Sequence, residues 1–352
     1  MTKSTTAFRY LAAALLGLTL LGAQGSEPTA PVARVSRLQP ADLGLVINTN
    51  DPYSVEVGAY YIQRRGLAPE QVLRVALPQR SRLTPQEFDA LQRQVHEHFG
   101  MRAQALALAW RQPYAVGCNA ITGALALGFD EALCERSCGR SRPSPYFNVQ
   151  RGKPLLHHGV RLSMLLAAPD VSAAKALIDR GVAADGRLGF KGAPPVNAYF
   201  VSTGDAARNV RARLFPPPAL LPAGVQVRVE QATAPAEPQR VLLYLTGLAK
   251  VPGLDDIDWV PGALADHLTS FGGQLEQEGS QMNAMAWIAS GATASHGAVS
   301  EPCNHLQKFP HPQLLLQHYL RGVTAIEAYW RSVAWPQQSL FVGEPLAAPF
   351  AR

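Results

Sequence analysis

An alternation of short apolar runs with amphipathic segments, over residues 43–110, constrains the fold more than any other feature of the sequence. Three apolar runs have the length of buried strands and lie at Leu43–Asn48, Val72–Leu77 and Ala103–Trp110. Each of the two segments between them carries a helix start signal. Ser54 can cap the first, and Thr84-Pro85-Gln86-Glu87 is a capping box with proline at the first helical position. Strand, helix, strand, helix, strand is typical of a parallel sheet with covering helices.

The same kind of pattern returns after residue 160 and continues toward the end of the chain. Strands are expected at 161–167, 196–202, 225–229, 241–246 and 264–270, and helices at 171–180, 206–214, 281–290, 312–320 and 326–333. Residues 111–160 differ, because a helix expected at 121–135 is followed by a stretch rich in Gly, Ser, Pro and Arg. We therefore predict one α/β domain over residues 41–352, with a loop-rich insertion at about 111–160. Its sheet should be mostly parallel and flanked by helices in three layers.

The first residues of the chain predict secretion. Lys3 and Arg9 precede the apolar run Tyr10–Leu21, and Ala23-Gln24-Gly25 offers small residues for signal-peptidase cleavage. The apolar run is too short for the roughly 20 residues that span a bilayer. We expect a signal peptide over residues 1–25, a proline-containing leader over 26–40, and a secreted or periplasmic chain without a membrane span.

The charge pattern and the loops after the strands exclude two classes of partner. The formal net charge of +6 is scattered along the chain, with no basic run of the kind that binds nucleic acid. No glycine-rich phosphate loop follows the first strand. We therefore expect neither a nucleic-acid partner nor a nucleotide or other cofactor.

Four cysteines, an even number, predict two disulfides in an oxidising compartment; they are Cys118, Cys134, Cys138 and Cys303. Three pairings are possible. Cys134 and Cys138 lie four residues apart and could bridge across one turn, which would leave Cys118 for Cys303. No histidine has finger-like spacing from the close pair, so a zinc site is not expected. A free thiol at Cys303 is the alternative that would matter for catalysis.

Residues 266–273, Asp-His-Leu-Thr-Ser-Phe-Gly-Gly, carry the densest chemistry. Ser270 as nucleophile, His267 as base and Asp266 as orienting group would form a catalytic cluster. In a strand, however, 266, 268 and 270 face one side of the sheet while 267 and 269 face the other. His267 and Ser270 would then point apart unless the strand breaks between them. The alternative is that these polar groups bond nearby backbone, and that Gly272 and Gly273 permit a tight turn.

Further ligand-binding candidates lie where expected strands end, the usual place for ligands in α/β sheets. They are Asn48, Asn50, Asp51, Thr246, Thr269, Gly272, Gly273 and Glu301. If strands 43–48, 241–247 and 264–270 end at one place, Asn48, Asp51 and Thr246 become neighbours of His267 and Ser270. Asp51 with Asp266 could then hold a divalent cation, but an Asx turn before Pro52 is the favoured alternative, so no metal is expected. Ser295-His296-Gly297 with Cys303 is a second candidate for catalysis.

The chain resembles a family of secreted bacterial proteins that occur in species carrying the exosortase protein-sorting system. The matching stretches are Asn48–Ser54, Ala183–Asp185, Asp266–Gly273, Gly291–Ala294, Ser300–Cys303 and Gly343–Pro345. They cover nearly the whole mature chain. The resemblance implies secretion and a role in sorting or surface assembly, and it brings no established activity.

The last third of the chain is similar to the gingipain and caspase-like cysteine peptidases in the order of its elements. Gly343-Glu344-Pro345 stands where the gingipain group has Gly-Asp-Pro. In those peptidases one strand ends in His-Gly and a later strand ends in the nucleophilic Cys. Here the two strands end in Leu245–Leu248 and Leu268–Phe271, so neither member of the Cys–His dyad is present.

The expected fold is therefore caspase-like or flavodoxin-like, and the resemblance implies a peptidase-like scaffold without its dyad. Such a protein would bind a peptide or an envelope protein at the strand ends. The alternative is a divergent hydrolase that uses Ser270 or Cys303 with His267 or His296.

Overall fold

The computed structural model describes residues 37–276 and 279–352. The expected signal peptide over 1–25 and most of the expected leader over 26–40 lie outside the described residues. The last residues of that leader belong to the domain, because Leu38 is buried and its backbone N–H donates to Glu327. The folded domain thus begins earlier than the predicted boundary at residue 41. Among the described helices, none has both the length and the apolar character needed to cross a bilayer.

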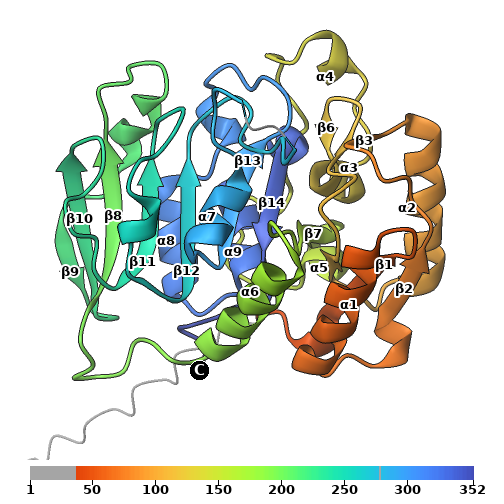
Figure 1. Cartoon of the computed structure of the whole chain (residues 1–352), viewed down its shortest axis with the longest axis horizontal. Coiled ribbons are helices and arrows are strands. Elements are labelled where there is room, and N and C mark those ends of the chain that lie inside the picture. The colour runs from red at the N-terminus through yellow and green to blue at the C-terminus, as the bar shows by residue number, and fades with distance from the viewer. Residues whose placement is uncertain (1–36, 277–278) are drawn as a thin grey trace, which may run out of the picture. The chain divides into compact units, whose positions relative to one another are not determined.

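One large sheet forms the centre of the domain, in the strand order β2-β1-β4-β7-β14-β13-β12-β11-β8-β10-β9 (Figure 1). Its strands are β1 (Leu43–Asn48), β2 (Val72–Val75), β4 (Ala105–Leu108), β7 (Leu162–Leu165), β8 (Val196–Ser202), β9 (Ala219–Leu221), β10 (Val225–Gln231), β11 (Val241–Thr246), β12 (Trp259–His267), β13 (Ala294–Ala298) and β14 (Ser339–Gly343). β2, β1, β4 and β7 pair in parallel, as do β13, β12, β11, β8 and β10. β14 joins the two groups: it runs antiparallel to β13 and meets β7 at the residue pair Val342–Leu165.

Helices cover both faces of this sheet. The helices of the described residues are α1 (Pro52–Arg65), α2 (Pro85–Phe99), α3 (Ile121–Leu127), α4 (Ala132–Glu135), α5 (Pro154–His158), α6 (Val171–Ala184), α7 (Ala284–Ser290), α8 (Pro312–Leu320) and α9 (Ala325–Ser332), and α4 lies in the insertion away from the sheet. Figure 1 shows α1, α6 and α7 in front of the sheet and α8 and α9 behind it. The mostly parallel sheet between helical layers confirms the predicted fold class.

Local signals explain where the first helices begin. The Asp51 side chain accepts a hydrogen bond from the N–H of Tyr53 at the start of α1, and Gly66 ends that helix in the left-handed region at φ 64°. The expected cap at Ser54 is wrong, because α1 begins two residues earlier and the Ser54 hydroxyl accepts from the N–H of Asn48 (2.8 Å). Thr84 and Glu87 form the predicted capping box of α2. The inner strands β1, β4, β7, β11, β13 and β14 are buried along their whole length, because helices cover them on both faces.

Residues 111–160 contain only short helices and strands, and these differ from the expected ones. The helix expected at 121–135 is two helices, α3 and α4, separated around Gly128, whose φ of 83° an α-helix cannot contain. Two short strands, β5 (Ala115–Val116) and β6 (Asn119–Ala120), form a small sheet with β3 (Arg82–Leu83). Elsewhere, the basic helix expected at 206–214 is a shorter 3₁₀ helix, η3 (Asn209–Leu214).

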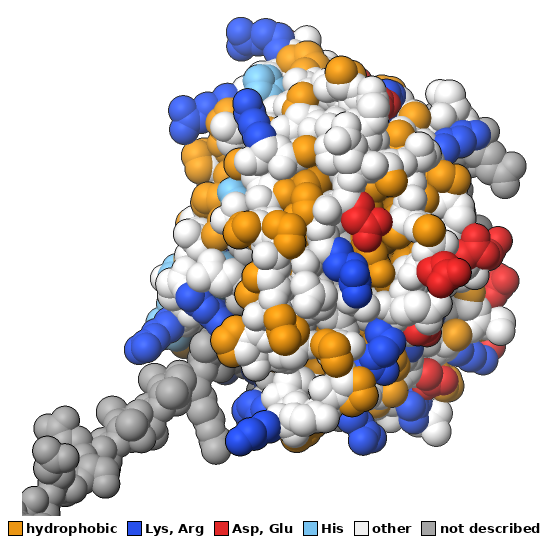
Figure 2. Space-filling view, turned by 90° about the vertical axis from the view of Figure 1, so that its left-hand side faces the viewer, with side chains coloured by type: hydrophobic (Ala, Val, Ile, Leu, Met, Phe, Trp, Pro, Cys, Tyr) orange, Lys and Arg blue, Asp and Glu red, His pale blue; other side chains and the backbone are white. Residues whose placement is uncertain are grey.

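The edge of the sheet farthest from β2 is the three-residue strand β9, which pairs antiparallel with β10. Its Leu220 is 64% exposed, and Figure 2 shows apolar side chains gathered among charged ones on this side of the molecule. A very short outermost strand offers few free backbone groups, which limits edge-to-edge pairing between molecules.

A buried ion pair attaches the end of the chain to the first helix. Glu344 follows β14, is fully buried and accepts hydrogen bonds from Tyr61 (2.7 Å) and Arg65 (2.6 and 3.0 Å). Arg65 also reaches Asp185 at 2.5 Å. α6 passes so close to this carboxylate that a Cβ on Gly181 would lie 2.6 Å from the Glu344 Cγ atom. Glu344, the residue in the Gly-Glu-Pro motif, thus holds three segments together.

We predict that Glu344→Gln destabilises the domain by about 3 kcal/mol, because Arg65 stays buried without its main partner. Glu56→Gln, which breaks the exposed Lys175–Glu56 pair (2.7 Å), should cost less than about 1 kcal/mol. Urea unfolding followed by circular dichroism measures both. Equal losses in the two variants would contradict a structural role of the buried pair.

Candidate functional site

The two charged candidates on β12 point to opposite faces of the sheet, as the alternation of side chains along a strand predicts. The register pairs Ala265 with Ser295 of β13, so the next residues, Asp266 and His296, lie side by side on one face. His267 lies on the other face, against Trp287 of α7. The expected catalytic group of Asp266, His267 and Ser270 is therefore divided by the sheet itself.

Asp266 is held in a closed ionic cluster. Its side chain is fully buried, forms an ion pair with Arg211 of η3 and lies 3.2 Å from the Nδ1 atom of His296. Burial by itself would raise the pKa of the Asp266 carboxyl. The Arg211 charge and the His296 hydrogen bond outweigh burial and lower that pKa to about 2. Asp266 is thus a permanent carboxylate whose oxygens are already bonded.

His267 has both ring nitrogens occupied. Nδ1 accepts a hydrogen bond from the Trp287 indole N–H (2.9 Å), so Nε2 carries the proton and donates to the Met282 carbonyl oxygen (3.0 Å). Burial lowers the pKa of this imidazole to about 4, against the opposing pull of the Asp266 charge. A neutral ring with no free nitrogen cannot take a proton from a nucleophile without breaking one of these bonds.

The strand ends at His267, and the hydroxyls beyond it lie in a loop. The Thr269 hydroxyl donates to Gln281 Oε1 (2.6 Å) and accepts from Arg208 Nε (3.2 Å). The Phe271 N–H donates to the same Gln281 oxygen (3.0 Å). Ser270 is partly exposed. Ser270 is therefore the one hydroxyl of the pair that solvent can reach.

Gly272 and Gly273 form the predicted tight turn, and the reason is close packing against β13. A Cβ on Gly297 would lie 2.1 Å from the Gly272 carbonyl carbon, and a Cβ on Gly273 would lie 2.6 Å from the Gly297 oxygen. The Gly273 N–H also donates to the Ala298 carbonyl (2.8 Å). Side chains at these positions would force the turn away from the sheet.

The candidates after β1 do not join this group. β1 and β12 are separated in the sheet by β4, β7, β14 and β13, which puts them about 24 Å apart at ~4.8 Å per strand. The expectation that Asn48 and Asp51 neighbour His267 and Ser270 is thus wrong, and so is an Asp51–Asp266 cation site. Asn48 and Asn50 donate to the Leu77 carbonyl, and Asp51 caps α1. Within residues 37–276 and 279–352, no group of three His, Cys, Asp or Glu residues could hold a metal.

Two other candidates are near the cluster. Thr246, at the end of β11, is buried and donates to the Val201 carbonyl (3.1 Å), while its own carbonyl accepts from Arg211 (2.9 Å). Glu301 follows β13 and accepts a hydrogen bond from the N–H of Cys303 (2.7 Å). Thr246 is therefore occupied inside the domain, whereas Glu301 is partly exposed.

The cysteines form two disulfides, as predicted, but with a different pairing. The bridges are Cys118–Cys134 and Cys138–Cys303. The proposed short bridge between Cys134 and Cys138 is wrong because α4 places Cys134 against the Gly117–Cys118 turn, where the Cys118 N–H lies 3.2 Å from its sulfur. Cys303 is consequently oxidised and supplies no thiolate.

Two hollows flank the loop that follows β12. One, of about 470 Å³, is lined by Phe271 and Gln274 together with Arg82, Cys118, Cys134 and Glu301, among others. The other, of about 760 Å³, is lined by the loop after β11, by residues within 275–276 and 279–289, and by Pro169 after β7. Its apolar lining includes Val251, Leu254, Leu275, Met282 and Met285. The turn at residues 271–275 thus contributes to both hollows.

Three residues that decide the chemistry of this region were not among the sequence candidates: Arg211, Gln281 and Trp287. Arg211 stands in the segment expected to be a basic surface helix, and a single arginine there cannot be told from a solvated one. Gln281 lies in the loop before α7, and Trp287 lies within α7. The sequence around each of them does not indicate that they bond Thr269 and His267. Only the tertiary structure brings them to the strand end.

No family model and no curated protein matches the chain significantly. The structure is similar to the crystal structure of the Arg-specific cysteine proteinase gingipain R (RGPB), with a TM-score of 0.47 and 10% sequence identity. The alignment covers 90% of this chain and 79% of that one. The fold class of the domain rests on its own strand order.

We predict that the free energy of unfolding decreases as the pH falls from about 6.5 to about 4. In this range His267 is protonated in the unfolded chain, whereas the buried ring of the folded chain stays neutral because its pKa is about 4. This ring accounts for roughly 3 kcal/mol of the loss. His267→Gln should reduce the slope of unfolding free energy against pH, measured by urea titration.

Two comparisons make this test specific. His318, whose pKa burial also lowers to about 4, retains its share of the slope in the variant. The exposed His96→Gln serves as the control and should keep the full slope. A wild-type slope in His267→Gln would show that the imidazole is not buried neutral.

Proposed function

We propose that this chain is a secreted binding protein that holds an extended peptide segment beside the end of β12, in the hollow of about 760 Å³. One contrast carries the proposal. Asp266, His267 and Thr269 are occupied by hydrogen bonds within the domain, while the hollow next to them is open and largely apolar. Such a place can bind a side chain without reacting with it.

The lining of this hollow fits a peptide. Val251 and Leu254 come from the loop after β11. Met282 lies just before α7, and Met285 lies in its first turn. Methionines are unbranched and adapt to different apolar groups. Lys250, Gln281 and Asn283 supply polar groups at the same hollow, suited to a peptide backbone. The similarity to exosortase-associated secreted proteins favours an envelope protein as the source of that peptide, in sorting or surface assembly.

A divergent hydrolase, the alternative, receives less support from the same residues. Cys303 is in a disulfide, and His267 uses both ring nitrogens. His296 is fully buried against Asp266, with aromatic rings of Phe309 and Phe341 on its sides. Ser270 remains as a nucleophile, and within residues 37–276 and 279–352 no histidine forms a hydrogen bond with its hydroxyl.

We predict that Met285→Glu weakens peptide binding by at least tenfold, because it replaces part of the apolar lining with a second carboxylate beside Glu276 that must be desolvated when a peptide binds. Linear peptides selected from a phage-displayed random library on the mature protein would serve as the probe, with fluorescence anisotropy as the measurement. Met101→Glu, at a methionine that is 55% exposed and does not line this hollow, should bind as the wild type does.

The serine variant separates the two functions. Ser270→Ala should bind the selected peptides unchanged, and the wild type should leave them intact on mass spectrometry. Cleavage by the wild type that Ser270→Ala abolishes would establish the hydrolase instead. Unaltered binding by Met285→Glu would exclude this hollow as the peptide site.

A further inference from the structure

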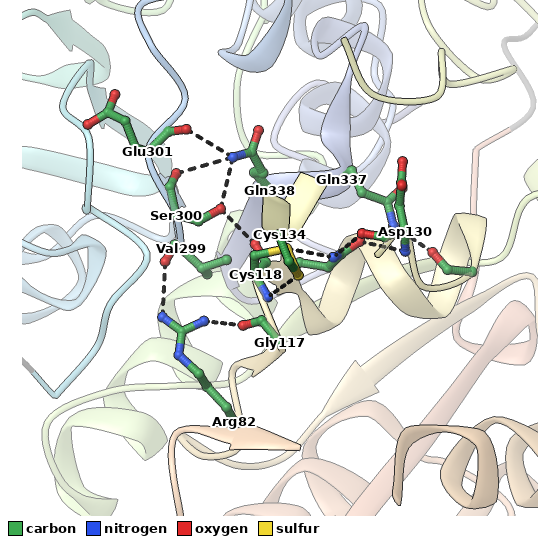
Figure 3. The surroundings of a disulfide bond; sticks show 12 residues. Arg82, Gly117, Cys118, Asp130, Cys134, Val299, Ser300, Glu301, Gln337 and Gln338 are labelled. Atoms are coloured by element: carbon green, nitrogen blue, oxygen red, sulfur yellow. Dashed lines mark hydrogen bonds between the residues drawn. A yellow bond between two sulfur atoms is a disulfide. The ribbon is translucent and has the colours of Figure 1, made fainter. Parts of the chain in front are cut away.

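The Cys118–Cys134 disulfide lies in the wall of the smaller hollow, where solvent reaches it. Both cysteines line that hollow of about 470 Å³, and Cys134, on the four-residue α4, is exposed. Figure 3 shows the bridge, both of whose cysteines belong to the insertion, close to Arg82 and Ser300. A sulfur in such a position can be approached by a thiol of another molecule.

Each sulfur of this bridge has a hydrogen-bond donor already in place. The Cys118 N–H lies 3.2 Å from Cys134 Sγ, and the Asn119 side-chain amide donates to Cys118 Sγ at 3.3 Å. A disulfide sulfur accepts such bonds weakly, whereas a thiolate accepts them strongly. The two donors therefore stabilise the reduced pair more than the oxidised one.

The positive charge of Arg82 adds to this effect. The Arg82 guanidinium donates to the carbonyl oxygens of Gly117 and Val299, across the mouth of the same hollow (Figure 3). In the described part of the chain no carboxylate forms an ion pair with it. Nearby cationic groups favour thiolates, which is how reactive cysteines are usually activated. Glu301, which lines the hollow too, is bonded instead to the N–H of Cys303.

The second disulfide has a different environment. Neither Cys138 nor Cys303 receives a hydrogen bond on sulfur among residues 37–276 and 279–352. Glu301 and Lys308 bring opposite charges beside it: Glu301 bonds the Cys303 N–H, and Lys308 bonds the Ser137 carbonyl (2.7 Å). This bridge also spans 165 residues of sequence, against 16 for Cys118–Cys134. Opening the longer loop releases more chain entropy and so destabilises the fold more.

We propose that Cys118–Cys134 is a thiol–disulfide exchange site that accepts electrons from a protein dithiol, and that Cys138–Cys303 is the structural bridge. A thiolate of the dithiol enters the hollow and attacks the Cys134 sulfur, the S–S bond breaks, and Cys118 leaves as a thiolate bonded by Asn119. The second thiol of the partner, as thiolate, attacks the partner's sulfur in the mixed disulfide and releases Cys134. Two electrons pass to this chain, the partner becomes a disulfide, and its two thiol protons pass to the new cysteine pair or to solvent.

Graded reduction tests the proposal. The mature protein is equilibrated with increasing dithiothreitol, alkylated and digested, and mass spectrometry gives the reduced fraction of each cysteine. Cys118 and Cys134 should be half reduced at a dithiothreitol concentration at least tenfold below that for Cys138 and Cys303. Simultaneous reduction of the two bridges, or earlier reduction of Cys138–Cys303, would overturn it.

A matched pair of arginine variants probes the cause. Arg82→Gln should raise the concentration that half reduces Cys118–Cys134, and Arg80→Gln, whose guanidinium pairs with Glu87 at the surface, should leave it unchanged. A thioredoxin variant with serine in place of its second active-site cysteine should form a mixed disulfide with Cys134 and not with Cys138. Trapping at Cys138, or an equal effect of both arginine variants, would contradict the assignment.

Discussion

The burial of Asp266 is the constraint on which the strand-end region depends. A carboxylate without any solvent contact stays ionised only if a cation and hydrogen bonds replace water. Arg211 supplies the cation and must come from outside the sheet, because the neighbouring strands β11 and β13 offer Leu245 and His296 at that level. Its guanidinium also bonds the Thr246 carbonyl and the Pro310 carbonyl. The segment that carries η3 is therefore fixed over the ends of β11 and β12.

This closure explains why the strand ends, the usual site of chemistry in α/β folds, offer so little of it here. Arg208, three residues before Arg211, bonds Asp205 and Thr269. Gly247 is so close to the same segment that a Cβ on it would lie 2.0 Å from the Arg208 carbonyl oxygen. A polar network with this many internal hydrogen bonds is rigid, and its ionisable groups are already bonded within the domain, so none is available to act as an acid or base. Recognition is thus left to the hollows on either side of it.

Local signals sufficed to predict the first half of the fold. The capping box at Thr84, the apolar runs of β1 and β4, and the glycine after α1 act within a few residues of themselves, although the first helix is capped by Asp51 and not by the expected Ser54. Strand order is a different kind of information. β14 is the last strand in sequence but lies in the middle of the sheet, between β7 and β13. The position of β14 between β7 and β13 increases the distance between β1 and β12, and no sequence signal near Asn48 or His267 indicates this position.

The candidate site was predictable to the same degree. The opposite facing of Asp266 and His267 follows from strand periodicity alone, and the Gly272-Gly273 pair by itself indicates a tight turn. The partners of those groups are another matter. Arg211, Gln281 and Trp287 lie 55, 12 and 20 residues from the atoms they bind. The prediction of the disulfide pairing was wrong for the same reason. Four cysteines allow three pairings, and only the path of the chain through the insertion selects one of them.

The Ser295-His296-Gly297 triplet shows how a catalytic-looking motif can arise from packing. Gly297 is small because the Gly272–Gly273 turn rests on its Cα, and any side chain there would meet the turn's backbone. His296 is a histidine because Asp266 beside it accepts a hydrogen bond from Nδ1, while Phe309 and Phe341 enclose the ring. Ser295 faces the other side of β13 and is buried. The packing of each residue in the triplet is thus determined by a different neighbour, and a shared catalytic role is not needed to explain the three residues.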